Sequence, residues 1–79
     1  MDNSKKLESI FNSMFGAEKI QFDDGLSPDK VELWDSISHM ELISKIEEAF
    51  GISFDAGEIA SMDNVGEIKK ILRKHGVDL

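Results

Sequence analysis

The segment Trp34-Asp35-Ser36-Ile37 places a single hydroxyl where an amphipathic stretch begins. Asp and Ser both favour the start of a helix, because their side-chain oxygens accept hydrogen bonds from the free backbone N–H groups there. Those N–H groups and the positive end of the helix dipole also favour a negatively charged group. Ser36 therefore has two compatible interpretations: a helix cap, or an exposed hydroxyl that carries an anionic group.

His39 follows Ser36 by one helical turn, so a hydrolase would use it as a general base. The chain lacks the Gly-x-Ser-x-Gly elbow of such enzymes, and its 79 residues leave little room for a substrate pocket. We expect both residues to lie on the surface without a catalytic role. His75 falls near the end of the last predicted helix, where a partly charged imidazole is favourable.

Four acids lie close together in the sequence, as the ligands of a calcium-binding loop do: Asp23, Asp24, Asp29 and Glu32. Their spacing lacks the Asp-x-Asp-x-Asp-Gly pattern that such a loop requires. With no cysteine in the chain, a disulfide framework, a thiolate nucleophile and a zinc–thiolate site are also excluded. We expect no metal site.

Three pieces around Ser36 together resemble the acyl carrier protein family. Asp-Ser-Ile at residues 35–37 is followed by Met-Glu-Leu at 40–42 and by Glu-Glu-Ala-Phe-Gly at 47–51. The family has matching pieces in this order and spacing. The resemblance implies an all-α fold and a carrier without catalytic activity. It also implies a 4'-phosphopantetheine arm on Ser36, flanked by Asp35 and Ile37.

The same resemblance implies the partners. A phosphopantetheinyl transferase would move the arm from coenzyme A onto Ser36. A ligase would load acyl or aminoacyl cargo as a thioester, and a downstream synthase or transferase would accept it. Enzymes of this kind read the second helix, where the matching positions are Ile37, Met40, Glu41, Glu47 and Glu48.

Departures from the family pattern indicate a specialised freestanding carrier rather than the housekeeping fatty acid carrier. Trp34 precedes Asp35, and Ser38, His39 and Ser44 replace the acidic, small and apolar types usual there. Specialised carriers of this kind serve polyketide, nonribosomal peptide, aminoacyl or surface-polysaccharide pathways.

The charge is concentrated in the middle of the chain. The formal net charge is −7, and residues 23–63 hold eleven acids and two bases. This segment repels nucleic acid and anionic lipid, and it speeds encounter with basic proteins. The main alternative to a carrier is therefore an unmodified acidic helical adaptor that binds a basic protein. Because no apolar run exceeds two residues and no signal peptide is visible, we expect a cytoplasmic monomer with no membrane insertion.

The hydrophobic periodicity predicts a single all-α domain over residues 1–79. The predicted elements are a first helix at about 4–15 that ends at Gly16, a second at 36–50 that ends at Gly51, a short turn at 55–60, and a last helix to Lys74 that begins with a capping box of Asn64 and Glu67. Together they predict a small antiparallel bundle of three main helices plus one short helix.

The apolar residues form two groups: those on one face of a helix, and those that fasten the long connection between the first two helices to the core. The second helix is predicted to present one apolar face of Ile37, Met40, Ile43, Ile46 and Phe50, broadened by Leu42. A connection of about 16–35 is long for a compact domain unless it is pinned or functional. The residues expected to pin it are Ile20, Phe22, Leu26, Val31, Leu33 and Trp34.

Overall fold

The computed structural model describes residues 3–16, 23–31 and 33–79, and no strand occurs among them. Within these ranges, four helices follow one another: α1 (Asn3–Phe15), α2 (Ser36–Phe50), α3 (Ala56–Ala60) and α4 (Val65–Lys74). The predicted all-α fold of three main helices and one short helix is confirmed. The helix boundaries agree with the prediction to within a residue.

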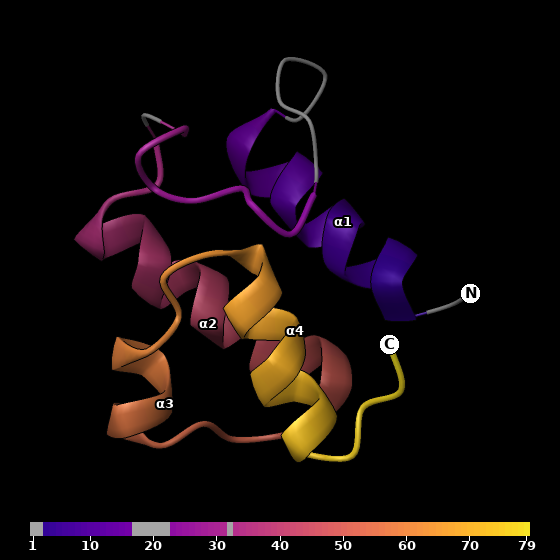
Figure 1. The fold of residues 1–79 in the computed structure, drawn as a ribbon. Helices are drawn as coiled ribbons and strands as arrows, with labels where there is room; N and C mark the ends of the chain where they lie inside the picture. Colours follow the sequence, from indigo (N-terminus) through magenta and orange to yellow (C-terminus); the bar gives the residue numbers. More distant parts are fainter. Residues whose placement is uncertain (1–2, 17–22, 32) are drawn as a thin grey trace.

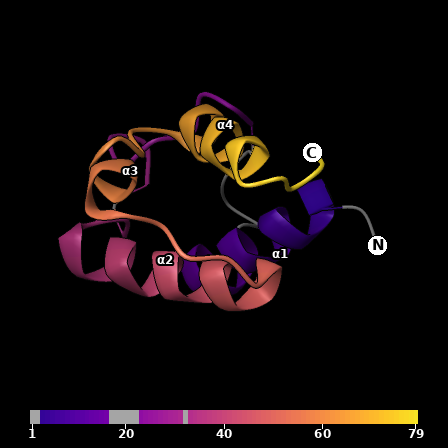
Figure 2. The same cartoon turned by 90° about the horizontal axis from the view of Figure 1, so that it is seen from below.

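The short helix α3 lies near the first turns of α2 and to one side of α4 (Figures 1 and 2). The start of α1 and the C-terminal residues lie side by side in both views. There the Asn3 side-chain nitrogen donates to the Asp78 backbone oxygen at 2.8 Å. The start of α2, which carries Ser36, lies far from both ends of the described chain (Figure 1).

An aromatic cluster joins the end of the long connection to α1. The Trp34 ring lies edge-on to Phe11 with 5.3 Å between ring centroids, and it stacks on Phe15 at 5.9 Å. Among the described residues, the core contains fifteen buried hydrophobic side chains, drawn from all the longer helices and from the connections. Because Trp34 is buried and directly precedes Asp35, this cluster anchors the point where α2 begins.

Three of the six predicted pins are confirmed and one is wrong. Leu26, Val31 and Trp34 are buried, but Leu33 is 62% exposed. The Trp34 backbone N–H donates to the Val31 oxygen at 3.0 Å, so a tight turn brings Val31 and Trp34 to the core side. Leu33 then projects outward. Ile20 and Phe22, the other two, lie outside the described residues.

The predicted apolar face of α2 is partly wrong. Ile43 and Ile46 are buried together with Leu42, but Ile37 is 79% exposed and Met40 is 53% exposed. The reason is geometric: Ile37 and Ile46 are nine residues apart, which is two and a half turns of a helix, so they face opposite ways. The helix therefore has one apolar stripe in the core and a second, shorter one at the surface.

Asp35, not Ser36, caps α2. Asp35 Oδ1 accepts from the Ser38 N–H at 2.9 Å, and Ser38 Oγ accepts from the Asp35 N–H at 2.9 Å, which completes a capping box. At the other end of α2, Gly51 takes the left-handed conformation with φ 66°, as predicted. Ser36 is thus the first residue inside the helix.

The other two caps use the same chemistry. Asp55 and Glu58 form a second capping box at the start of α3, which the sequence analysis missed. A capping box of Asn64 and Glu67 was predicted for α4. One of its two hydrogen bonds is formed, in which the Asn64 side-chain oxygen accepts from the Glu67 N–H at 2.8 Å. Each short connection therefore ends in a side chain that satisfies the first free N–H groups of the next helix.

The second half of the long connection is fastened to the start of α4. The Val65 N–H donates to the Leu26 oxygen and the Gly66 N–H donates to the Asp24 oxygen, both at 2.9 Å. Lys69 Nζ lies 2.8 Å from Asp24 Oδ1, and this hydrogen bond and charge lower the pKa of Asp24. These contacts supply the pinning that a connection of this length requires.

Candidate functional site

The Ser36 hydroxyl is exposed at the first position of α2. Within the described part of the chain, its side chain makes no hydrogen bond. The capping interpretation of Ser36 is therefore wrong, because Asp35 already fills that role. The hydroxyl is held at the end of a rigid helix and is left free to react with an incoming group.

An open hollow of about 810 Å³ lies beside Ser36, between the first turns of α2 and the helix α3. Its apolar lining comes from both helices and their flanking connections: Trp34, Met40, Ile59 and Met62. Three acids, Asp29, Asp35 and Asp63, complete its charged lining. An apolar surface therefore lies directly beside the Ser36 hydroxyl.

His39 forms a bridge at this hollow. Trp34 Nε1 donates to His39 Nδ1 at 3.0 Å, and His39 Nε2 lies 3.3 Å from the Ile59 backbone oxygen on α3. The imidazole also stacks on the Trp34 indole with 6.2 Å between centroids. The expectation that His39 is simply a surface residue is wrong, because it is half-buried and joins three segments.

Ionisation at the start of α2 is controlled by the same capping contacts. The hydrogen bond from the Ser38 N–H is the main cause that lowers the pKa of Asp35. Asp35 is therefore ionised at neutral pH, one residue before the Ser36 hydroxyl. Among the described residues, Ser36 and His39 make no hydrogen bond with each other, so the Ser–His arrangement of a hydrolase is not formed.

The exposed face of α2 combines apolar and charged side chains. Ile37, Met40, Glu41, Ser44 and Lys45 line a second shallow hollow on this face. Glu48 is exposed one turn beyond Ser44. The predicted apolar and acidic docking positions Ile37, Met40, Glu41 and Glu48 thus lie on one surface that begins beside Ser36.

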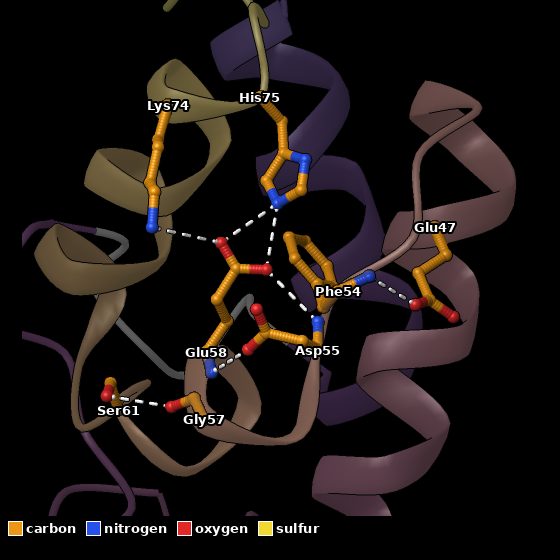
Figure 3. A network of polar contacts seen from close by, with 8 residues as sticks. All are labelled: Glu47, Phe54, Asp55, Gly57, Glu58, Ser61, Lys74 and His75. Atoms are coloured by element: carbon orange, nitrogen blue, oxygen red, sulfur yellow. Dashed lines mark hydrogen bonds and ion pairs between the residues drawn. The ribbon is translucent and has the colours of Figure 1, made fainter.

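Glu47 differs from the other predicted docking residues. It is half-buried, and its Oε2 accepts from the Phe54 N–H at 2.8 Å (Figure 3). Its backbone oxygen also accepts from the Gly51 and Ile52 N–H groups. Glu47 therefore holds the connection between α2 and α3 in place.

A polar cluster fastens the other side of α3 (Figure 3). His75 Nε2 lies 2.9 and 3.0 Å from the two Glu58 carboxylate oxygens, and Lys74 Nζ lies 3.7 Å from Glu58. The hydrogen bond with His75 is the main cause that lowers the pKa of Glu58. His75 caps the end of α4, as its position in the sequence indicates, and its ring packs edge-on against Phe54.

Within the described residues, no group of three or more His, Cys, Asp or Glu side chains could hold a metal ion. Glu32, one of the acids considered for a calcium loop, lies outside those residues. In the described part of the chain, no helix has the length and apolar character needed to cross a membrane.

Two comparisons with known proteins found matches. A family model described as "Phosphopantetheine attachment site" matches residues 6–72. Among solved structures, the chain is similar to the holo acyl carrier protein of Geobacter metallireducens, determined by solution NMR. The two share 32% sequence identity with a TM-score of 0.76, over 100% of this chain and 97% of that one. A comparison with curated proteins found no match.

Proposed function

This chain belongs to the phosphopantetheine-attachment family of non-catalytic carrier proteins, and from that premise we propose that Ser36 is its attachment residue. The observation that carries the proposal is the free, exposed hydroxyl at the first position of α2. Because Asp35 supplies the cap, modification of Ser36 would leave the start of the helix intact. When bound, the 4'-phosphopantetheine arm supplies a terminal thiol that holds cargo as a thioester.

The attachment step is a phosphoryl-group transfer from coenzyme A. The Ser36 oxygen forms a bond to the β-phosphorus, the pyrophosphate bond breaks, and 3',5'-ADP leaves. The hydroxyl proton passes to a base of the phosphopantetheinyl transferase, which this chain does not supply. The product is a phosphodiester between Ser36 and the arm.

Neighbouring serines have other partners or other positions. Ser38 Oγ accepts from the Asp35 N–H and donates to the Leu33 oxygen at 2.6 Å. Ser61 Oγ donates to the Gly57 oxygen at 2.9 Å. Ser44 is exposed on α2 but lies two turns beyond the helix start. Ser36 is the serine that combines a free hydroxyl with the apolar hollow.

The proposed docking surface is the exposed face of α2, namely Ile37, Met40, Glu41 and Glu48, with Glu47 at its edge. It suits a partner with an apolar pocket rimmed by Lys and Arg. Exposed ion pairs contribute only about 0–1 kcal/mol each, so the apolar contact at Ile37 must supply much of the affinity. The proposed partners are a phosphopantetheinyl transferase, a ligase that loads the cargo, and a synthase or transferase that accepts it.

The cargo class is acyl or aminoacyl, and the proposed setting is cytoplasmic. Trp34 and His39 are part of the hollow beside Ser36, at positions where this chain departs from fatty acid carriers. This departure supports a specialised pathway, such as polyketide, nonribosomal peptide or surface-polysaccharide synthesis, over housekeeping fatty acid synthesis.

The test is the intact mass of the protein after incubation with coenzyme A and a broad-specificity phosphopantetheinyl transferase. We expect the wild type and Ser44→Ala to gain one phosphopantetheinyl group and Ser36→Ala to gain none. Ser44→Ala is the matched control because it removes another exposed serine from the same helix. A folded wild-type protein that gains no mass would overturn the proposal and favour the acidic adaptor.

A further inference from the structure

The exposed large apolar side chains of this protein are not scattered over its surface. Among the described residues there are three of them, namely Leu33, Ile37 and Met40. All three fall within residues 33–40, and Ser36 lies among them. A single exposed hydrophobic residue is normal on a protein surface, but a group of them at one place indicates a surface that another molecule covers.

Leu33 differs from the other two because it lies on the connection, before α2 begins. The Trp34 N–H donates to the Val31 oxygen at 3.0 Å, and both of these side chains are buried. The turn that brings them to the core leaves Leu33 on the outside, where it is 62% exposed. Leu33 thus adds an apolar side chain outside the docking surface proposed on α2.

The backbone of Leu33 is held in place although its side chain is exposed. Its oxygen accepts from Ser38 Oγ at 2.6 Å and from the Asp35 N–H at 3.2 Å. These two bonds tie Leu33 to the capping box at the start of α2, and the buried Trp34 anchors the next residue. Because the backbone is already ordered, little conformational freedom remains to be lost when a partner covers this side chain.

Leu33 is close enough to Ser36 to fall under any enzyme that reacts there. The two residues are three positions apart, so their Cα atoms lie within about 11 Å of each other. Small transient interfaces cover about 600 Å² on each partner, and a circular contact of that area has a radius of about 14 Å. The start of α2 and the connection before it lie at one edge of the molecule (Figure 1). An enzyme centred on Ser36 therefore reaches Leu33.

The phosphopantetheinyl transferase is the proposed partner that must approach the Ser36 oxygen itself, because the new bond forms at that atom. The ligase and the accepting enzyme react instead with the thiol at the far end of the arm. The transferase also meets a chain that has no arm yet, so its contacts with the carrier come from the side chains alone. A contact directly beside Ser36 is therefore most useful to the transferase.

We propose that Leu33 is a recognition residue for the phosphopantetheinyl transferase, which it contacts from the connection in addition to the contact at Ile37 on α2. This inference rests on the proposed function. The exposed carboxylates of Asp35 and Glu41 lie on the same segment as the apolar side chains. The matching site on the transferase is accordingly an apolar pocket with Lys or Arg beside it.

Two leucines on the connection give a matched pair for the test. Leu33 is exposed, whereas Leu26 is buried with 4% exposure. The hydrogen bonds at Leu33 use its backbone, so substitutions of the side chain keep them. Urea unfolding should show the wild-type midpoint for Leu33→Ala and a lower midpoint for Leu26→Ala. A lower midpoint for Leu33→Ala would overturn the proposal, because the side chain would then be part of the fold.

The apparent KM and kcat of a broad-specificity phosphopantetheinyl transferase with coenzyme A are then measured on the unmodified proteins by mass spectrometry. Leu33→Ala should raise KM about three- to tenfold, as expected when one apolar side chain no longer becomes buried, and kcat should not change. Leu33→Met keeps an apolar side chain of similar volume and should restore a KM near that of the wild type. Leu33→Lys should raise KM further, because it places a cation against a basic partner.

A wild-type KM for Leu33→Ala would overturn the proposal, and so would a loss confined to kcat. The alternative occupant is a second copy of this chain, and sedimentation velocity on the unmodified protein tests it. We expect a monomer, and a dimer that Leu33→Ala dissociates would overturn the proposal. A folded wild-type protein that gains no arm would overturn the proposed function together with this inference. An arm gained with equal KM by the wild type and Leu33→Ala would overturn this inference alone.

Discussion

Two isoleucines on α2 give a matched test of which face binds partners. Ile37 is 79% exposed beside Ser36, and Ile46 is fully buried two and a half turns further along. Replacement of each by alanine removes the same atoms from the same helix. One substitution should damage the fold and the other should damage recognition.

The expected magnitudes follow from these burial fractions. Truncation of a buried isoleucine costs about 2–5 kcal/mol, so Ile46→Ala should remove a large part of the ~4–12 kcal/mol typical of a domain this size. Ile37 buries about a fifth of its side chain, which is worth ~0.3–0.6 kcal/mol. The better helix propensity of alanine offsets roughly 0.4 kcal/mol of that. The net change for Ile37→Ala should be near zero.

Function should respond in the opposite order. An apolar anchor at a docking site contributes more than about 1 kcal/mol, which corresponds to at least a fivefold rise in KM for the transferase. Ile37→Ala should show that rise with an unchanged urea midpoint. Urea unfolding followed by circular dichroism at 222 nm measures the stability, and transfer kinetics by mass spectrometry measure the recognition.

The result that would refute this reasoning is a destabilised Ile37→Ala protein or one with wild-type transfer kinetics. The first would mean that Ile37 packs into the core after all. The second would mean that partners do not read this face.

Ser36→Ala should change the free energy of unfolding by less than about 0.5 kcal/mol, because the exposed hydroxyl makes no cap; a loss typical of a removed N-cap in urea unfolding would show that Ser36 does cap the helix. Since the pKa of Asp35 is lowered by its bond from the Ser38 N–H, its stabilisation is fully present above the ordinary value of 3.8 and is lost as the pH falls through the lower native value. Asp35→Ala should therefore be less stable than the wild type at pH 7 and equal to it near pH 2, and Asp35→Asn should stay close to the wild type at pH 7; thermal melts that show no convergence would contradict this. The pKa of Glu58 is lowered mainly by His75, so the loss of stability in Glu58→Gln should likewise be full above the ordinary value of 4.5 and should shrink as the pH falls through the lower native value. A difference in stability between the wild type and Glu58→Gln that stays constant down to pH 2 would count against a stabilising contact between Glu58 and His75.

The fold follows from local signals that this chain carries clearly. Helix boundaries are readable because α2, α3 and α4 each have a capping residue at the start, and Gly16 and Gly51 end α1 and α2 in the left-handed conformation. The sequence offers both Asp35 and Ser36 as caps for α2, and the structure uses Asp35, in a capping box with Ser38.

Periodicity alone does not choose between two apolar stripes. Ile37, Met40, Ile43 and Ile46 follow one another at three-residue steps, and such steps drift around the helix by 60° each. The drift carries Ile37 and Met40 out of the core. Where along the helix the buried stripe ends depends on how α1 and α4 pack against α2. The prediction that Leu33 is buried was wrong for a related reason, because a tight turn and not a helix sets the direction of its side chain.

The bridge at His39 is not readable from the sequence because its partners are non-local. Ile59 is twenty residues away, and the contact is to a backbone oxygen whose residue type carries no information. The Trp34 contact spans five residues and crosses the start of the helix. Only the folded arrangement of α2 and α3 brings the three groups together.

The central claim is that the arm is attached to Ser36, and peptide mapping tests it most directly. Trypsin cuts after Lys30 and Lys45, which releases residues 31–45 with Ser36, Ser38 and Ser44 on one peptide. After incubation with coenzyme A and a transferase, fragmentation of this peptide places the added mass on one serine. The account predicts all of it on Ser36. Mass on Ser38, on Ser44 or on a different peptide would contradict the account.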